Sequence, residues 1–280
     1  MSFIKKLPIH GWIGFALIAT FWSLNWFLSG LRAHLMFFPL WFGYCLAVDG
    51  LTVVRRGNSI FTRDRLLFWE MFLISIPVWW LFELLNIRAQ NWFYDGRQFF
   101  TDLQYAILAS LSFSTVIPAV FCTANLITTF KWHSKIKTGF RIIPTPKKML
   151  SIFMLGWLML ALLLIFPRYF FPLMWLSVYF IIEPVNVWLK HKSLFDHLAR
   201  GDWRPLIALS VGCLTCGLFW EMWNFYSYPK WLYKIPFVDF LHIFEMPLLG
   251  YLGYLSFPLE LYAFYNLVTG FLKRKESWSL

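Results

Sequence analysis

Seven carboxylic acids lie within the apolar stretches of this 280-residue chain, and those stretches contain no lysine or arginine to neutralise them. The acids are Asp49, Glu70, Glu83, Glu183, Glu221, Glu245 and Glu260. A charged side chain at the centre of a bilayer costs roughly 2.5 to 3.5 kcal/mol on insertion scales, so each acid must be protonated, hydrogen-bonded, hydrated or paired with a loop cation or ligand. A carboxyl kept from water retains its proton to higher pH, which prepares it to act as a general acid.

Two of these acids, Glu83 and Glu221, have matching neighbours. Each is followed three residues later by an asparagine, Asn86 or Asn224, and this spacing places carboxyl and amide on one helix face. An asparagine can hold a neutral carboxyl through a hydrogen bond, so the pattern predicts two equivalent acid and amide faces that meet. The alternative is simple placement at the membrane interface, since both acids lie within four residues of an expected helix end.

Tryptophans beside the same acids indicate which chemistry they could perform. Trp79 lies next to Glu83, and Trp220 and Trp223 lie next to Glu221. Aromatic faces stabilise cations, so an acid that protonates an alkene and tryptophans that hold the resulting carbocation form a consistent pair. We therefore expect Glu83, Glu221 and Glu245 as catalytic residues of an outer polar layer, with the asparagines and tryptophans binding the substrate.

A second, inner polar layer is expected from Asp49 and Glu183, with Glu70 and Glu260 as additions. Glu183 precedes Pro184, just as Glu245 lies two residues before a proline. Proline removes a helix hydrogen bond and frees a carbonyl, which is typical of a ligand or ion site within a membrane. The alternative is a kink that serves packing alone.

Other kinds of site have little support in the sequence. Cys213 and Cys216 have the spacing of a redox motif, but in an apolar helix they are better explained as packing residues. The histidines lie at the edges of apolar segments or in loops, and no phosphate-binding glycine-rich loop is present. The residues 92–94 and 231–233 contain Trp and Tyr, which we interpret as anchors at the membrane interface. We expect no metal and no cofactor.

The composition sets the architecture that must position these residues. The chain is 59% hydrophobic and only 14% charged, which indicates an all-α, polytopic membrane helix bundle. A spanning helix needs about 20 mostly apolar residues. Eight segments of about that length are predicted to span the membrane: 11–30, 35–54, 66–86, 103–130, 150–167, 169–189, 206–225 and 242–270.

The basic residues predict the orientation of these eight spans. Of the 25 Lys and Arg, nineteen fall on the side of both termini and in the loops 55–65, 131–148 and 190–204, while six fall on the other side. Because cytoplasmic loops carry the excess of Lys and Arg, we expect both termini in the cytoplasm, in a bacterial inner membrane. This distribution explains the net charge of +11 without nucleic-acid binding.

The two halves of the chain repeat each other in order. Phe38-Pro39-Leu40 recurs at 171–173, Asp49 is matched by Glu183, and Ser59 is matched by Ser193. Glu83 and Asn86 are then matched by Glu221 and Asn224, and Trp92-Phe93-Tyr94 by Trp231-Leu232-Tyr233. We predict two parallel four-helix repeats, 1–130 and 150–280, joined by a basic cytoplasmic linker at 131–149, with the functional site at the seam.

Two resemblances to known families add to this interpretation. The segments WEMWN (220–224), PKWLY (229–233) and FEMPLLGY (244–251) resemble a family of uncharacterised bacterial multi-span membrane proteins, over most of the chain. Through Glu83, Glu221, Glu245 and the two Trp-x-Tyr segments, the chain is also similar to the membrane lycopene cyclase and carotenoid hydratase group. That similarity implies repeated helix sets, acids within helices and an isoprenoid substrate.

Three functions remain open at this point. The first is an enzyme that binds a polyprenoid or other membrane lipid in the seam and protonates it with Glu221 or Glu83. The second is a proton-coupled transporter or carrier, in which the two acid layers are successive stations. The third is a non-catalytic scaffold or assembly factor. A homo-oligomer and a second membrane protein both remain open as partners.

Overall fold

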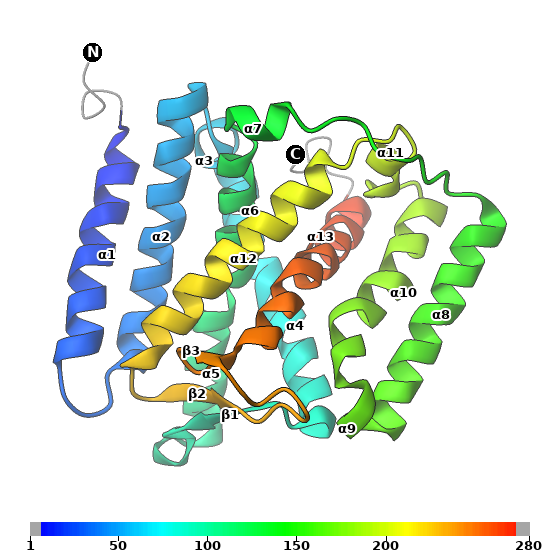
Figure 1. Ribbon diagram of the computed structural model, residues 1–280. Helices are drawn as coiled ribbons and strands as arrows, with labels where there is room; N and C mark the ends of the chain where they lie inside the picture. The colour runs from blue at the N-terminus through cyan, green and yellow to red at the C-terminus, as the bar shows by residue number, and fades with distance from the viewer. Residues whose placement is uncertain (1–6, 273–280) are drawn as a thin grey trace.

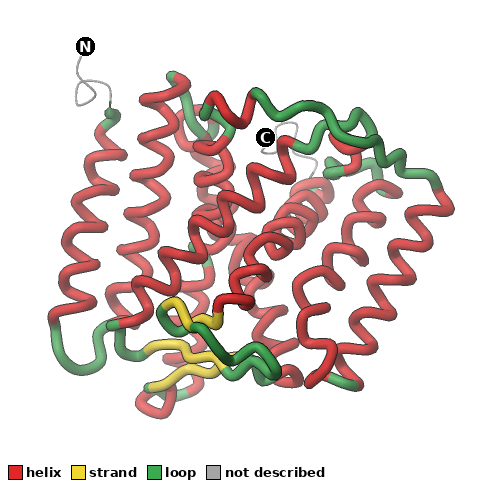
Figure 2. The backbone as a smooth tube through the Cα atoms, viewed as in Figure 1, coloured by secondary structure: helices red, strands yellow, loops and turns green. Residues whose placement is uncertain are grey.

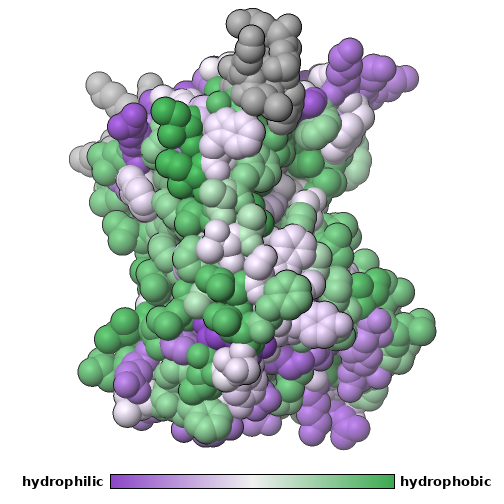
Figure 3. Space-filling view, turned by 90° about the vertical axis from the view of Figure 1, so that its left-hand side faces the viewer, coloured by the Kyte–Doolittle hydropathy of each residue, from purple (hydrophilic) through white to green (hydrophobic). Residues whose placement is uncertain are grey.

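The computed structural model describes residues 7–272, and this part of the chain is all-α apart from two small two-stranded sheets (Figures 1 and 2). Long helices run side by side between the two ends of the molecule, where the strands, short helices and loops collect. Hydrophilic side chains gather toward the upper and lower ends in Figure 3, while the part between them is mostly apolar. This arrangement is the one that a protein surrounded by lipid requires.

Six helical segments among the described residues are long and apolar enough to cross a membrane. They identify the chain as an integral, multi-pass membrane protein. Their bounds are α2 (Ala33–Arg56), α4 (Arg65–Ala89), α5 with α6 (Asp102–Phe113 and Val116–Ile127), α8 (Pro146–Ile165), α9 with η3 and α10 (Pro167–Phe170, Phe171–Leu173 and Met174–Trp188) and α12 (Arg204–Phe225).

The first and last of the eight expected spans correspond to α1 (Ile9–Phe27) and α13 (Gly253–Phe271), which are helices of 19 residues each. Neither belongs to the six apolar segments among the described residues. Helix α1 packs on α2 at very close range, because a Cβ atom on Gly14 would lie 2.4 Å from the backbone nitrogen of Ala47. Small residues at such contacts let membrane helices approach closely.

The expected span 242–270 is wrong in its first part. Residues 242–252 form the strands β3 (His242–Ile243) and β4 (Met246–Pro247) and the short helix η4 (Leu248–Leu252), with His242 paired to Pro247. The apolar run hides this break, yet Pro247 supplies a reason for it, since the residue before a proline disfavours the helical conformation. The expected span 103–130 is likewise interrupted between α5 and α6 and ends at residue 127.

A two-stranded sheet closes the lower end of the bundle in Figure 1 and joins residues far apart in the sequence. Strand β1 (Trp92–Asp95) pairs antiparallel with β2 (Lys230–Tyr233), with Trp92 opposite Tyr233 and Tyr94 opposite Trp231. The short helix η2 (Arg97–Phe99) follows β1. This sheet therefore carries both Trp-x-Tyr segments on adjacent strands.

The opposite end holds three short helices, α3 (Ile60–Arg63), α7 (Lys131–Ser134) and α11 (Phe195–Leu198). Helix α1 begins at this end and α13 ends there (Figure 1). The linker that follows α7 pairs with the α11 region, where the Gly139 N–H donates to the Gly201 carbonyl at 2.8 Å. Lys5, Lys6 and the basic residues 273–275, which count in the predicted charge distribution, lie outside the described residues.

Candidate functional site

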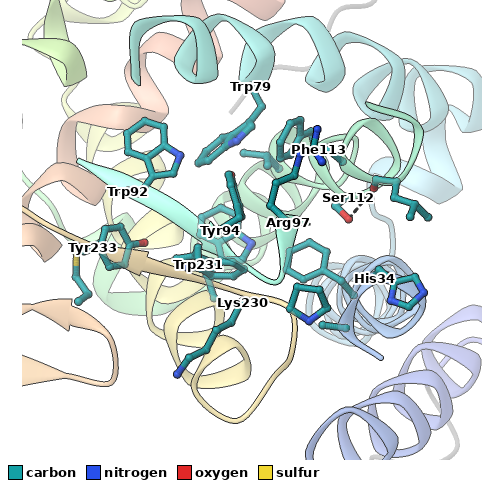
Figure 4. A pocket seen from close by; sticks show the side chains of 18 of the residues that line it. His34, Trp79, Trp92, Tyr94, Arg97, Ser112, Phe113, Lys230, Trp231 and Tyr233 are labelled. Carbon is teal, nitrogen blue, oxygen red and sulfur yellow. Dashed lines mark hydrogen bonds between the residues drawn. The ribbon is translucent and has the colours of Figure 1, made fainter. Parts of the chain in front are cut away.

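A cavity of about 200 Å³ lies beside the sheet formed by β1 and β2 (Figure 4). Elements from both halves of the chain line it, from the start of α2 to α13, and more than half of the lining residues are Phe, Trp or Tyr. The aromatic members are Phe37, Trp79, Trp92, Tyr94, Phe100, Tyr105, Phe113, Trp175, Trp220, Trp231, Tyr233, Tyr254 and Phe257. The cavity is therefore an aromatic chamber, typical of a site for an apolar or cationic group.

The half-buried carboxyl of Glu83 lies directly behind this lining. Its Oε1 atom accepts hydrogen bonds from the indole N–H of Trp79 (2.9 Å), the indole N–H of Trp92 (3.1 Å) and the hydroxyl of Tyr94 (2.5 Å). All three donors line the cavity. Trp79 comes from the preceding turn of α4, while Trp92 and Tyr94 point to the same acid because alternate residues of a strand face the same side.

Glu221 occupies a matching position on α12 and is fully buried, with 0% of its surface exposed. Its Oε1 atom accepts hydrogen bonds from the hydroxyls of Tyr233 (2.7 Å) and Tyr254 (2.6 Å), which both line the cavity. Its Oε2 atom is buried and has no hydrogen-bond partner among the described residues. A buried oxygen without a donor is the position where a carboxyl proton would be held.

Burial also keeps the tyrosines of the sheet in their neutral form. Burial, and next the nearby charge of Glu83, raise the pKa of Tyr94 well above its ordinary value. Burial and the charge of Glu221 raise the pKa of Tyr233 in the same way. Both hydroxyls are therefore protonated and available as donors at physiological pH.

The asparagines act differently from the expectation that they hold the acids. The Asn86 side-chain amide donates to the carbonyl of Trp92 at 2.7 Å, and its Oδ1 accepts from the N–H of Asn91 at 2.8 Å. Asn224 makes the equivalent pair with Trp231, donating to its carbonyl at 2.7 Å and accepting from its N–H at 3.0 Å. The asparagines thus hold the start of each strand, and the strands carry the tyrosines that bind the acids.

Two of the predicted tryptophans, Trp79 and Trp220, line the cavity. Trp223 instead belongs to the buried aromatic core, with its ring centroid 4.9 Å from that of Trp41. Trp92 and Trp231 were expected as interfacial anchors, yet both line the cavity and Trp92 is buried. Each acid is followed by a Trp-x-Tyr segment whose tyrosine lies eleven residues after Glu83 or twelve after Glu221, and this recurrence was the signal that could have assigned Tyr94 and Tyr233 to the acids.

Glu245 lies in the turn between β3 and β4 rather than within a helix, which corrects its expected place in a span. Its carboxylate pairs with the ammonium of Lys230. Pairing with a cation outside the spans is one of the ways expected for these acids to be neutralised. Glu245 therefore has its charge partner at the start of β2, whereas Glu83 and Glu221 are held by neutral donors.

The other predicted pair, Asp49 and Glu183, holds loops at the opposite end of the bundle. The Ser59 hydroxyl donates to Asp49 at 2.5 Å, and the backbone N–H of Phe61 donates to it at 3.1 Å. Glu183 accepts equivalent bonds from the Ser193 hydroxyl (2.9 Å) and the Leu194 N–H (2.5 Å). Both acids therefore position the short helices that follow them, α3 and α11.

The two acids added to that inner layer differ in their surroundings. Glu260 on α13 is 1% exposed, and neither of its carboxyl oxygens has a hydrogen-bond partner among the described residues. Glu70 on α4 is half-buried. The four cysteines are buried free thiols, and the described residues include no group of three or more His, Cys, Asp or Glu that could hold a metal ion.

Comparisons with protein-family models, curated proteins and solved structures found no match to this chain. What the site can do chemically follows from its geometry. Two carboxyls lie one hydrogen bond behind an aromatic cavity, and their hydrogen-bond donors among the described residues are neutral Trp and Tyr side chains. Such a site can supply a proton and can stabilise a positive charge.

Proposed function

We propose that this protein is a membrane enzyme that binds an unsaturated lipid chain of the polyprenoid class in the aromatic cavity and protonates it from Glu221. One observation carries the proposal. Glu221 is completely buried, two hydroxyls that line the cavity hold one of its oxygens, and its other oxygen has no partner among the described residues. This arrangement suits an acid that stores a proton beside an apolar substrate.

The chemical step is proton transfer to a carbon–carbon double bond. The π electrons form a new C–H bond with the proton, and the second alkene carbon becomes a carbocation that the aromatic faces stabilise. The carboxylate then recovers a proton from a neighbouring carbon, which shifts the double bond or completes a ring closure without any further reagent. Tyr233 and Tyr254 lie between Glu221 and the cavity and donate to its Oε1 atom. Either can relay the proton when its hydroxyl rotates to accept the carboxyl proton and gives its own proton to the alkene.

The size of the cavity limits what enters it. Its volume of about 200 Å³ is below the ~300 to 1,000 Å³ typical of pockets that enclose a whole ligand. We therefore propose that only a segment of the lipid chain is held near Glu221. The rest of the chain then lies outside the chamber.

Glu221→Gln is the test of this function, because glutamine keeps the size and a hydrogen-bond acceptor but has no acidic proton. We expect the variant to fold and to lose product formation from an unsaturated lipid extract, measured by mass spectrometry. Glu260→Gln is the matched control, since Glu260 is also a buried glutamate but its oxygens have no hydrogen-bond partner among the described residues that line the cavity. Full turnover by Glu221→Gln would remove the proposal.

We also propose that the chain consists of two parallel repeats of four spans, with α1 and α13 as the first and eighth spans. The equivalent hydrogen bonds support this duplication: Asn86 and Asn224 hold equivalent tryptophans, and Asp49 and Glu183 hold equivalent serines. The pairing of β1 with β2 adds to the support, because Phe93 lies opposite its counterpart Leu232. A two-fold axis along the membrane normal would produce that register.

The charge distribution supports a cytoplasmic position for the end that carries α3, α7 and α11. The basic loops 55–65, 131–148 and 190–204 belong to this end. The resemblance to bacterial multi-span proteins supports the bacterial inner membrane as the location. The cavity and the β1–β2 sheet would then face the outer half of that membrane.

A proton-coupled carrier is the second candidate function, and Glu260 is the observation that favours it. This acid is buried without a partner for either oxygen among the described residues, as a proton-binding station requires. Asp49 and Glu183 are less suited to that role, because each is held in place by a serine hydroxyl and a backbone N–H. pH-driven flux in vesicles that Glu260→Gln abolishes would favour the carrier.

A further inference from the structure

Several aromatic rings that line the cavity donate hydrogen bonds to the two carboxyls behind it. Tyr94, Trp79 and Trp92 each donate a hydrogen bond to Glu83, and Tyr233 and Tyr254 each donate one to Glu221. A ring that donates a hydrogen bond to a carboxylate gains electron density from it. In the state in which both carboxyls are ionised, which for Glu221 is the state without its proton, five aromatic rings of one cavity are therefore polarised in the direction that strengthens attraction to a cation.

The basic residues of the lining are already occupied. The Arg97 guanidinium pairs with Asp102, donates to the Phe100 carbonyl at 2.7 Å and lies 4.3 Å from the centroid of the Tyr105 ring. Lys230 pairs with Glu245, and in Figure 4 its amine points away from Trp231 and Tyr94. Each of these cations has its own carboxylate.

The third basic residue of the lining is His34, at the start of α2. When His34 is neutral, the charge balance around the cavity is set by Glu83 and Glu221. The Trp and Tyr side chains that donate hydrogen bonds to these two carboxyls are neutral. A ligand with a positive charge would complete that balance, whereas a phosphate or carboxylate inside the cavity would oppose it.

We infer that this cavity binds organic ammonium ions, with the alkylated nitrogen enclosed by the aromatic rings in front of Glu83 and Glu221. A water, with one heavy atom, occupies about 30 Å³ of liquid volume. A trimethylammonium group has four heavy atoms, so a cavity of about 200 Å³ has room for it. Methyl groups around the nitrogen suit this chamber, because they spread the charge and contact ring faces without needing hydrogen-bond acceptors. The ligand class is therefore a protonated tertiary amine or a quaternary ammonium ion. Binding of such an ion goes beyond the proposed function, whose substrate is an unsaturated lipid chain.

Choline and its neutral isostere 3,3-dimethylbutan-1-ol test the inference, because the two differ in charge and hardly in shape. The full chain is placed in nanodiscs of phosphatidylglycerol, which carry no choline headgroup, and binding is followed by tryptophan fluorescence. We expect choline to bind about tenfold or more tightly than the alcohol, equivalent to about 1.4 kcal/mol. Equal affinities, or no binding of choline, would overturn the inference.

Variants identify the source of the preference for charge. Glu83→Gln and Glu221→Gln should each reduce the affinity for choline and leave that for the alcohol unchanged. Glu260→Gln is the matched control, since Glu260 is likewise buried, on α13, but accepts no hydrogen bond from a described residue that lines the cavity. Tyr254→Phe keeps the ring and removes its bond to Glu221, and serves if a glutamine variant fails to fold. A charge preference that persists in all three cavity variants would contradict the assignment.

The outcome separates this inference from the proposed enzyme. Choline binding without any lipid product would retain the ammonium site and remove the catalytic function. Lipid product that depends on Glu221, without a preference for choline over the alcohol, would do the reverse.

Discussion

Glu83 and Glu221 differ in one respect that assigns them separate roles. Glu83 directs one oxygen at three donors, which suits an anchored carboxylate. Glu221 has two donors on one oxygen and none among the described residues on the other, which suits a carboxyl that holds and releases a proton. We therefore assign the proton donor to Glu221 and charge stabilisation to Glu83.

Tyr94→Phe should lower stability through loss of one bond to Glu83, while Trp79 and Trp92 remain as donors. A hydrogen bond to a charged group is worth about 1.5 to 3 kcal/mol, so a fall in the melting temperature of several degrees is expected. Thermal unfolding of the purified protein in detergent measures it, with the exposed Tyr169→Phe as the control. An unchanged melting temperature in Tyr94→Phe would show that this bond contributes nothing.

The strands β1 and β2 are the elements that bring the tyrosines to the acids, and the two asparagines hold those strands. The bond from Asn224 to the Trp231 backbone fixes the strand that carries Tyr233. The short distance along β2 makes this coupling direct, since Tyr233 follows Trp231 by two residues and faces the same side. The position of β2 therefore determines whether the Tyr233 hydroxyl reaches Glu221.

Asn224→Leu should consequently reduce activity more than binding of lipid. It removes two hydrogen bonds to β2, at a cost of about 1 to 3 kcal/mol for each backbone group left buried without a partner. Tyr233 then leaves Glu221, so product formation should fall about tenfold or more while lipid still co-purifies. Product and bound lipid are both measured by mass spectrometry. Equal activity of Asn224→Leu and wild type would disconnect the sheet from the site.

Much of the arrangement of elements could be predicted from the sequence, because apolar runs of about 20 residues are typical of spanning helices. The expected span 206–225 corresponds closely to α12 (Arg204–Phe225). The segment 242–252 could not be assigned, since an apolar run that folds as strands has the composition of a helix. Of the residues expected at the site, Trp79 and Trp220 line the cavity, and Glu83 and Glu221 lie one hydrogen bond behind it. Tyr254 was missed because its bond to Glu221 joins residues 33 positions apart.

At the scale of the whole molecule, the proposed orientation places the two ends of the bundle in opposite compartments. The end with α3, α7 and α11 carries the basic loops, and the other end carries the β1–β2 sheet and the cavity. All four native cysteines are buried. Engineered cysteines in the loops can therefore report on each end separately.

Lys137→Cys in the basic linker and Asp239→Cys in the loop after β2 test this orientation, and both native side chains are exposed. In intact spheroplasts, we expect a membrane-impermeant maleimide to label the cysteine at 239 and not the one at 137. Inside-out vesicles should give the reverse. Labelling of both cysteines from one side would contradict the topology.

Incorporation of deuterium into the lipid is the most direct test of proton transfer from Glu221 to a carbon–carbon double bond. The protein is incubated with an unsaturated polyprenoid in nanodiscs made with heavy water, and the recovered lipid is analysed by mass spectrometry for deuterium bound to carbon. We expect carbon-bound deuterium with the wild type and with Glu260→Gln, and its loss with a folded Glu221→Gln. Deuterium incorporation that is equal with Glu221→Gln, or absent with the wild type, would contradict it.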